Sequence, residues 1–236
     1  MADQEKIAGI LGGMGPEATV DLMQRVIRLT PASDDIDHIR CIVDNNPKVP
    51  SRIKAIIEGT GEDPGPAMAD MGRRLEVFGA DFLAIACNTA HVYHGAVQDA
   101  VKIPVIHVIE AVVRHIREHF KPSGPIGILA SPAVAMTGLY AKELEKYGLA
   151  DLWPGPAQQD RLLDVIKAVK KGDKSPRVRQ AYQAVSAALA DKGAEIAVVA
   201  CTELSALDES LPLETVDAAE VLAAEIVRRA KGGDAD

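Results

Sequence analysis

The chain has 236 residues, of which 47% are hydrophobic, 25% are charged and 3% are aromatic, and its formal net charge is −8. A negative charge without a dense lysine and arginine cluster argues against nucleic-acid binding, and so few aromatic residues leave little for stacking on bases. The N-terminal sequence lacks the basic and apolar regions of a signal peptide, and no apolar run reaches membrane-spanning length. We therefore expect a cytoplasmic protein that binds neither nucleic acid nor membrane.

Short apolar runs alternate along the chain with longer segments of helical periodicity, which predicts an α/β fold with mainly parallel strands. The predicted strands are Ile7–Leu11, Ile39–Asp44, Phe82–Ala86, Val105–His107, Ile126–Ala130 and Ile196–Ala200. The predicted helices are Ala18–Leu29, Pro66–Phe78, Glu110–His119, Gly138–Tyr147, Asp160–Lys170, Arg177–Asp191 and Ala218–Ala230.

An internal repeat indicates two similar domains. Residues 79–87 match residues 193–201 without a gap, at a spacing of 114 residues, and a Pro-led strand and a helix follow each segment. Repeats of this period are typical of duplicated domains, although a general likeness among βα units is the alternative explanation. We predict one domain from residues 1–103 together with 213–236, and a second from residues 104–212.

Cys87 and Cys201 end the two matched segments. Each follows a predicted parallel strand and precedes a helical segment, and open α/β sheets bind ligands beyond the carboxyl ends of their strands. A thiol at such a junction lies near unpaired N–H groups and the positive end of a helix dipole, which favours thiolate. A small buried cysteine at a strand end is the alternative for either residue alone. Two in matched positions indicate chemistry, whereas Cys41 lies mid-strand and is predicted to be a core residue.

Other polar positions could bind a ligand. The glycine-rich turn at residues 12–19 partly matches a dinucleotide fingerprint, but Pro16 lacks the N–H that a pyrophosphate would need. A dinucleotide site, a small carboxylate site and a simple tight turn all stay open. Arg52 could bind a carboxylate with two hydrogen bonds, although an arginine at a helix start is usually only solvated. His115 and His119 form one HxxxH pair, but a single pair does not define a site, so no metal is predicted.

Four motifs in order resemble the aspartate racemase family of the Asp/Glu/hydantoin racemase superfamily. They are Gly-Gly-Met-Gly-Pro-Glu-Ala-Thr at 12–19, Asn-Asn-Pro…Pro-x-Arg at 45–52, Cys-Asn-Thr-Ala-His at 87–91 and Cys-Thr-Glu at 201–203. The resemblance covers essentially the whole chain. It implies two pseudo-symmetric flavodoxin-like domains with the active site between them, no cofactor, and usually a homodimer.

The resemblance also implies roles for individual residues. Cys87 and Cys201 would be the two acid/base groups, and Arg52 would hold a substrate carboxylate. Lys170 falls where the family often has a substrate-binding lysine, and Ser51 stands where the family usually has aspartate. The other residues that would line the site are Met14, Asn88, Thr89, Thr202 and Glu203.

The predicted function is cofactor-independent racemisation of an acidic amino acid, aspartate or glutamate. One thiolate removes the Cα proton and one thiol delivers a proton to the opposite face. Polar donors and the cations Arg52 and Lys170 would stabilise the carbanion and bind both carboxylates. One alternative is another reaction with the same cysteines, such as hydantoin racemisation or maleate isomerisation. Another is a two-lobed small-molecule-binding protein without catalysis, whose affinity would survive deletion of both thiols.

Overall fold

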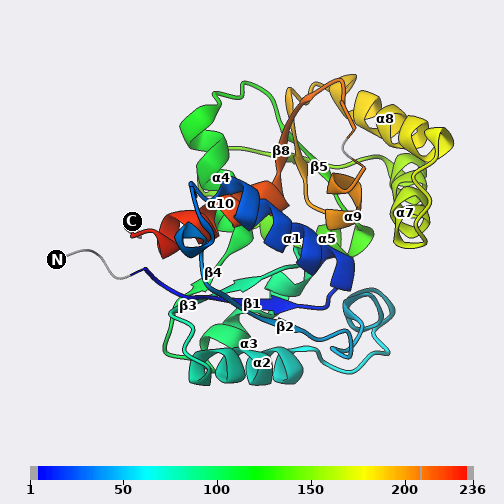
Figure 1. Cartoon of the computed structure of the whole chain (residues 1–236). Coiled ribbons are helices and arrows are strands. Elements are labelled where there is room, and N and C mark those ends of the chain that lie inside the picture. The colour runs from blue at the N-terminus through cyan, green and yellow to red at the C-terminus, as the bar shows by residue number, and fades with distance from the viewer. Residues whose placement is uncertain (1–4, 208, 233–236) are drawn as a thin grey trace. The chain divides into compact units, whose positions relative to one another are not determined.

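The computed structural model describes residues 5–207 and 209–232. Strands and helices alternate along the chain (Figure 1). The strands are β1 (Ala8–Gly12), β2 (Cys41–Asn45), β3 (Phe82–Ile85), β4 (Val105–Ile106), β5 (Ile126–Leu129), β6 (Asp151–Leu152), β7 (Ile196–Val199) and β8 (Glu214–Asp217). The α-helices are α1 (Pro16–Leu29), α2 (Gly65–Val77), α3 (His94–Gln98), α4 (Val108–His119), α5 (Pro132–Thr137), α6 (Leu139–Glu145), α7 (Pro156–Lys170), α8 (Pro176–Ala190), α9 (Thr202–Ser205) and α10 (Ala218–Ala230). Short helical turns are η1 (Asp35–Asp37), η2 (Lys54–Glu58) and η3 (Thr89–Tyr93).

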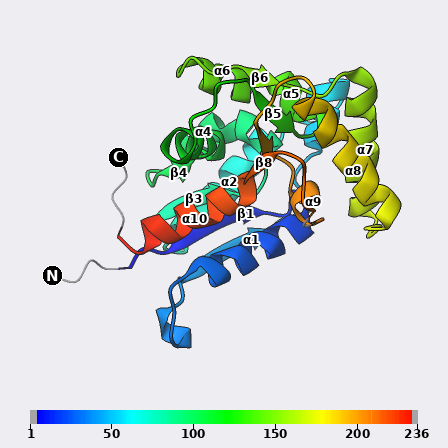
Figure 2. The ribbon, with the colours of Figure 1, turned by 90° about the horizontal axis from the view of Figure 1, so that it is seen from above.

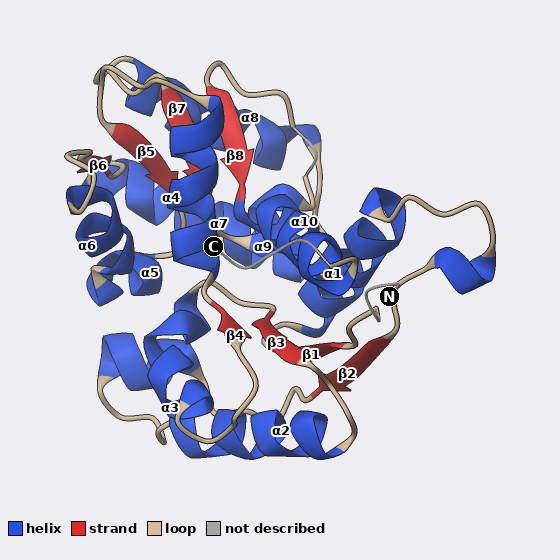
Figure 3. Cartoon of the chain, turned by 90° about the vertical axis from the view of Figure 1, so that its left-hand side faces the viewer, coloured by secondary structure: helices blue, strands red, loops and turns tan. Residues whose placement is uncertain are grey.

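The chain divides into two compact units, one formed by residues up to Ala111 together with those from Glu220 onward, the other by Val112–Ala219. The first unit contains a four-stranded parallel sheet of order β2-β1-β3-β4. Helices α2 and α3 cover one face of this sheet, and α1 and α10 lie on the other (Figure 3). Figure 2 shows α1 and α10 side by side, where Arg25 pairs with the Glu220 carboxylate at 2.9 Å.

The second unit contains a four-stranded parallel sheet of order β6-β5-β7-β8. Its core joins β5 and β7 to α7 and α8, through apolar side chains that include Leu129, Val199, Leu162 and Leu189. Strand for strand, this order repeats that of the first unit. The prediction of an α/β chain with parallel sheets in two similar halves is therefore confirmed.

The sequence repeat is also present in the backbone. Gly79 and Gly193 occupy the same repeat position and both have positive φ, 97° and 92°. The residue after each glycine donates its N–H to the carbonyl of Leu75 in one unit and of Leu189 in the other, at 3.1 Å in both. Each glycine thus ends a helix with the left-handed turn that leads into the strand before a cysteine.

The division between the units differs from the expected one. Residues 104–111 belong to the first unit and residues 213–219 to the second. The reason is the pairing of the fourth strand in each sheet: β4 pairs with β3, and β8 pairs with β7. Each unit therefore keeps its Pro-led strand, and the chain crosses between units only after that strand.

Some elements were not predicted. Strand β6 has two residues, too few to show the alternation from which a strand is inferred. Helices α3, α5 and α9 have four to six residues and show no full helical period. Helices α1 and α7 begin at Pro16 and Pro156, earlier than predicted, because proline is well suited to the first turn of a helix. In the described part of the chain, no helix has the length and apolarity needed to span a bilayer.

The two repeats offer a matched test of packing. A Cβ at Gly9 would lie 2.6 Å from Leu83 Cδ2, whereas at Gly127 the nearest atom, Leu189 Cδ1, would be 3.3 Å away. We expect Gly9→Ala to lower the free energy of unfolding by about 1–3 kcal/mol, because the added methyl overpacks the core. Gly127→Ala should lower the free energy of unfolding by less, because the new methyl has more room. Both variants restrict the unfolded chain equally, so that effect does not contribute to the difference. Urea denaturation followed by circular dichroism compares them, and equal losses would contradict this account.

Candidate functional site

Chemically active side chains gather at the carboxyl edge of the first sheet. Parallel pairing brings strand ends together there, with Gly12 opposite Asn45 and Leu11 opposite Ile85. Cys87 follows β3 at this edge, and His107 follows β4. The glycine-rich turn leaves β1 at the same edge. Cys87 and the glycine-rich turn therefore lie at the sheet edge where open α/β sheets commonly bind ligands.

Cys87 is half-buried, and a buried histidine holds its turn. The Cys87 carbonyl lies 2.8 Å from Nδ1 of His91, and Nε2 of His91 accepts the N–H of Val108 at 3.1 Å. Because Nε2 accepts, Nδ1 must carry the proton and donate to Cys87. Burial lowers the pKa of His91 to about 3, and the neighbouring His107 adds to this effect. The ring is therefore neutral at physiological pH.

Asn88 and Thr89 continue the same turn and are half-buried. Asn88 precedes η3, and its carbonyl accepts the N–H of His91 at 3.1 Å. Thr89 is the first residue of η3. Both residues expected beside Cys87 are thus part of the turn that carries the thiol.

The glycine-rich turn packs against the segment after β2. Gly13 has φ +86°, and a Cβ there would lie 2.2 Å from the carbonyl carbon of Asn46, so only glycine fits. The N–H of Gly13 donates to Thr19 Oγ1 at 2.8 Å. That bond occupies a donor that a phosphate would need, which favours the tight-turn interpretation. Met14 follows in the turn and is buried.

Arg52 joins the two loops of this edge. One terminal nitrogen, Nη1, donates to the carbonyl of Pro50 at 3.0 Å and of Val49 at 3.4 Å, and Nη2 donates to the carbonyl of Met14 at 3.1 Å. Its buried Nε has no partner among the described residues. Burial and the charge of Asp63 raise the pKa of Tyr93, and the positive charge of Arg52 opposes this rise. Arg52 therefore lies near the turn after Cys87, and main-chain carbonyls take much of its hydrogen-bonding capacity.

Cys201 follows β7 in the second unit, after Ala200, and directly precedes α9. Its Sγ donates to Oε2 of Glu203 at 3.0 Å, and the Thr202 hydroxyl donates to the same oxygen at 3.4 Å. The other carboxylate oxygen pairs with Lys170 Nζ at 3.4 Å. Burial raises the pKa of Cys201 well above its ordinary value, Glu203 adds to this, and Lys170 opposes it. Cys201 is therefore a protonated thiol whose proton points at a carboxylate.

The structure thus brings the predicted residues together within each unit. Lys170, Cys201, Thr202 and Glu203 form one connected cluster in the second. Half of the Lys170 side chain is exposed. In the first unit, the other predicted site residues lie along the carboxyl edge of the sheet. They are Met14, Arg52, Cys87, Asn88 and Thr89.

Three further residues were not predicted to take part. His91 is the last residue of the Cys-Asn-Thr-Ala-His motif, but no role was predicted for it. No role was predicted for Ser205 or Asp217 either. Ser205 Oγ lies 3.4 Å from the Cys201 carbonyl and donates to Asp217 Oδ1 at 2.8 Å. The sequence repeat could have indicated these residues, because Ser205 occupies the repeat position that corresponds to His91.

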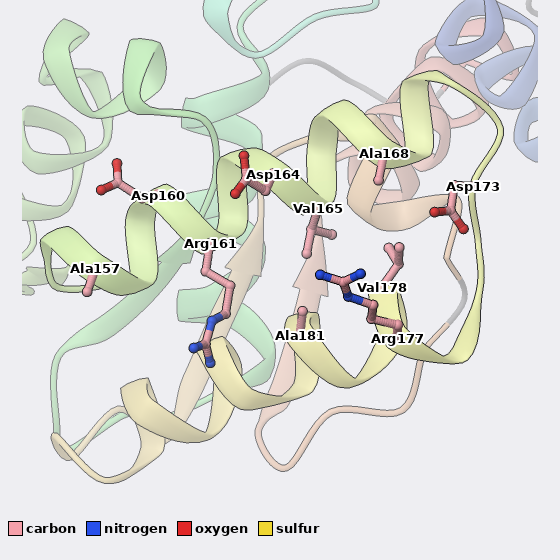
Figure 4. Close-up of a pocket in the computed structure, with 10 residues that line it drawn as sticks. All are labelled: Ala157, Asp160, Arg161, Asp164, Val165, Ala168, Asp173, Arg177, Val178 and Ala181. Atoms are coloured by element: carbon pink, nitrogen blue, oxygen red, sulfur yellow. The ribbon is translucent and has the colours of Figure 1, made fainter.

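A separate groove of about 610 Å³ lies between α7 and α8 in the second unit. Figure 4 shows Asp160 and Arg161 on α7 and Arg177 on α8 among the side chains around it. None of its lining residues is a predicted site residue. Across the described residues, no three His, Cys, Asp or Glu side chains are arranged to hold a metal ion.

Comparison with known proteins gives consistent matches. Residues 11–226 match the family model of Asp/Glu/Hydantoin racemase. The chain is 29% identical over 210 residues to the broad specificity amino-acid racemase RacX of Bacillus subtilis (strain 168), covering 87% of this chain and 89% of that protein. Its structure resembles that of Picrophilus torridus aspartate racemase, with a TM-score of 0.83, 28% identity, and coverage of 95% and 94% of the two chains. The fold also matches an aspartate racemase homologue from Pyrococcus horikoshii OT3, with a TM-score of 0.76, 22% identity, and coverage of 95% and 99%.

The contact between Cys201 and Glu203 predicts a change in thiol reactivity. Glu203→Gln removes the negative charge beside Sγ, so the pKa of Cys201 should fall and more thiolate should be present at neutral pH. We expect iodoacetamide to alkylate Cys201 roughly three- to tenfold faster at pH 7.5. Peptide mass spectrometry measures the rate. Glu195→Gln is the control, because Glu195 is exposed and binds Ser123; an unchanged rate in Glu203→Gln would contradict the assignment.

Proposed function

The chain belongs to the Asp/Glu/hydantoin racemase family, and we propose that it racemises an acidic amino acid, aspartate or glutamate, without a cofactor. Cys87 and Cys201 would be the two acid/base groups. The observation that carries the proposal is the pair of equivalent cysteine turns. Each cysteine follows the third strand, in sheet order, of a four-stranded parallel sheet. We also propose that the protein acts as a homodimer.

The two thiols would exchange roles with the direction of the reaction. A thiolate on one face takes the Cα proton, and the thiol on the other face gives its proton to the carbanion, so one proton is removed and one is added. In the direction in which Cys201 is the acid, its protonated state supports this role. In the reverse direction Cys201 must first lose its proton. The hydrogen bond of 3.0 Å to Glu203 supports transfer to that carboxylate.

Stabilisation of the carbanion would come from polar side chains of the two turns. The amide of Asn88 and the hydroxyls of Thr89 and Thr202 are candidate donors toward a substrate carboxylate. Met14 would line the same pocket as an apolar wall. Fixed donors of this kind stabilise charge that develops on the substrate without having to reorient during the reaction.

The choice of an acidic substrate depends on the cations. Lys170 is half-exposed and could bind a carboxylate while keeping Glu203 within reach. Arg52 supports the assignment less directly, because its terminal nitrogens already bind three main-chain carbonyls. This observation favours a second candidate, racemisation of a broader set of amino acids. Incubation with a panel of pure enantiomers, followed by chiral chromatography, distinguishes the two.

The two-base mechanism predicts an isotopic asymmetry. In D₂O, starting from one pure enantiomer, early inverted product should carry deuterium at Cα while recovered substrate stays mostly protiated. The reason is that the group that removes the proton differs from the solvent-equilibrated donor. Cys87→Ala and Cys201→Ala should each abolish net inversion. Proton NMR and chiral chromatography measure both quantities.

Cys41→Ala is the matched control for this experiment. Cys41 is also a half-buried cysteine, but it pairs with Ala8 at the start of β2, away from the carboxyl edge. This variant should racemise at the parental rate. Parental racemisation by Cys87→Ala or Cys201→Ala would contradict the two-base proposal. Equal early deuterium in substrate and product would contradict it as well.

The proposed role of Lys170 predicts a loss specific to acidic substrates. Lys170→Met should lower kcat/KM for aspartate and glutamate. The expected loss of transition-state stabilisation is roughly 1.5–3 kcal/mol, because a charge-assisted hydrogen bond is removed. Lys171→Met is the control, since Lys171 is the next residue and is exposed. Steady-state kinetics with both amino acids measures the change. If Lys170→Met and Lys171→Met behave alike, Lys170 does not bind the substrate.

A further inference from the structure

Each cysteine carbonyl is contacted by the residue four positions later in the chain. His91 donates to the Cys87 carbonyl at 2.8 Å, and the Ser205 hydroxyl lies 3.4 Å from the Cys201 carbonyl. His91 and Ser205 stand 114 residues apart, which is the spacing of the repeat. The two residues are equivalent in position, but Ser205 binds the Cys201 carbonyl through its main-chain N–H, at 3.2 Å, because its one hydroxyl proton goes to Asp217.

In the first unit the contact continues to the next helix. Nε2 of His91 accepts the N–H of Val108 at 3.1 Å, and Val108 is the first residue of α4, directly after β4. Both His91 and Val108 are 2% exposed. One imidazole thus connects the cysteine turn to the N-terminus of the helix that follows the neighbouring strand.

In the second unit the main-chain N–H of Ser205 and two side chains make the corresponding connection. Ser205 donates to Asp217 Oδ1 at 2.8 Å, and that oxygen accepts the N–H of Ala219 at 2.9 Å. Asp217 ends β8 and Ala219 lies in the first turn of α10. The partner strand and the partner helix occupy the same places as β4 and α4 in the first unit. The connection is therefore present twice, built once from His and once from Ser and Asp.

We propose that His91, and Ser205 together with Asp217, are positioning residues that fix the two cysteine turns for proton transfer. This inference rests on the proposed function. A thiol that must reach one face of Cα tolerates little displacement, since a shift of about 1 Å can cost on the order of 100-fold in rate. Anchoring the cysteine carbonyl to a neighbouring helix restricts such a shift. Neither anchor touches the substrate in this proposal.

The experiment compares the two anchors in the full-length chain. His91→Leu and Ser205→Ala remove the anchoring groups, whereas His91→Asn keeps a donor near the Nδ1 position and Ser205→Thr keeps the hydroxyl. We expect His91→Leu and Ser205→Ala to lower kcat for racemisation by roughly 10- to 100-fold, with KM changed by less than about threefold. His91→Asn should recover part of the loss, and Ser205→Thr most of it.

A second readout separates positioning from general stability and needs no catalysis. Iodoacetamide modification of each cysteine, followed by peptide mass spectrometry, reports how firmly each turn is held. Cys87 should react roughly three- to tenfold faster in His91→Leu, with Cys201 changed less than about twofold. Ser205→Ala should give the reverse pattern. If His91→Leu does not fold, His91→Asn and the Ser205 pair provide the same comparison.

Three outcomes would overturn the inference. One is an unchanged kcat in both anchor variants, and another is an equal rise in reactivity at both cysteines. The third is a loss of kcat in Ser205→Ala that Ser205→Thr does not recover. If instead Cys87→Ala and Cys201→Ala leave racemisation intact, the proposed function fails, while the alkylation pattern still decides whether the anchors hold the turns.

Discussion

Parallel pairing forces the carboxyl ends of four strands to one edge of each sheet, and the candidate site residues other than Lys170, which ends α7, depend on this constraint. Strand β1 delivers the glycine-rich turn, β3 delivers Cys87, and β7 delivers Cys201. Strands β1, β3 and β7 are apolar and buried, so the polar groups that they deliver come only after each strand ends. The same sheets that form the two cores therefore determine where chemistry is available.

The two cysteines share a topology but not an environment. Cys87 is held by a buried neutral histidine, whereas Cys201 faces the carboxylate of Glu203 and lies in a turn bonded to Asp217. Negative charge and burial at Cys201 both favour the protonated thiol. A two-base reaction needs one group with a proton and one without at any moment. In the proposed reaction, Cys201 would be the group that starts with a proton.

Much of the fold could be predicted from the sequence, because six strands and seven helices produce strong apolar periodicity. The residues that were missed depend on contacts across long separations. Ser205 bonds Asp217 and His91 bonds Val108, and no local pattern marks either pair. The sequence predicted Arg52 as a ligand-binding residue. It could not predict the three hydrogen bonds of Arg52 to main-chain carbonyls, because these depend on the path of two loops. The domain boundaries were displaced because strand pairing, not the proline that starts a strand, decides which unit keeps it.

The ion pair between Lys170 and Glu203 links substrate binding to proton transfer, if Lys170 binds a substrate carboxylate as proposed. Without substrate, the positive charge of Lys170 lies 3.4 Å from Glu203 and opposes the rise in the Cys201 pKa. A substrate carboxylate would share that charge and leave Glu203 less compensated. Sγ of Cys201 lies 3.0 Å from that carboxylate and donates to it. Because the charge of Lys170 lowers the Cys201 pKa, sharing that charge with an acidic substrate would keep the proton on Sγ, the state in which Cys201 acts as the acid, whereas a neutral side chain would not.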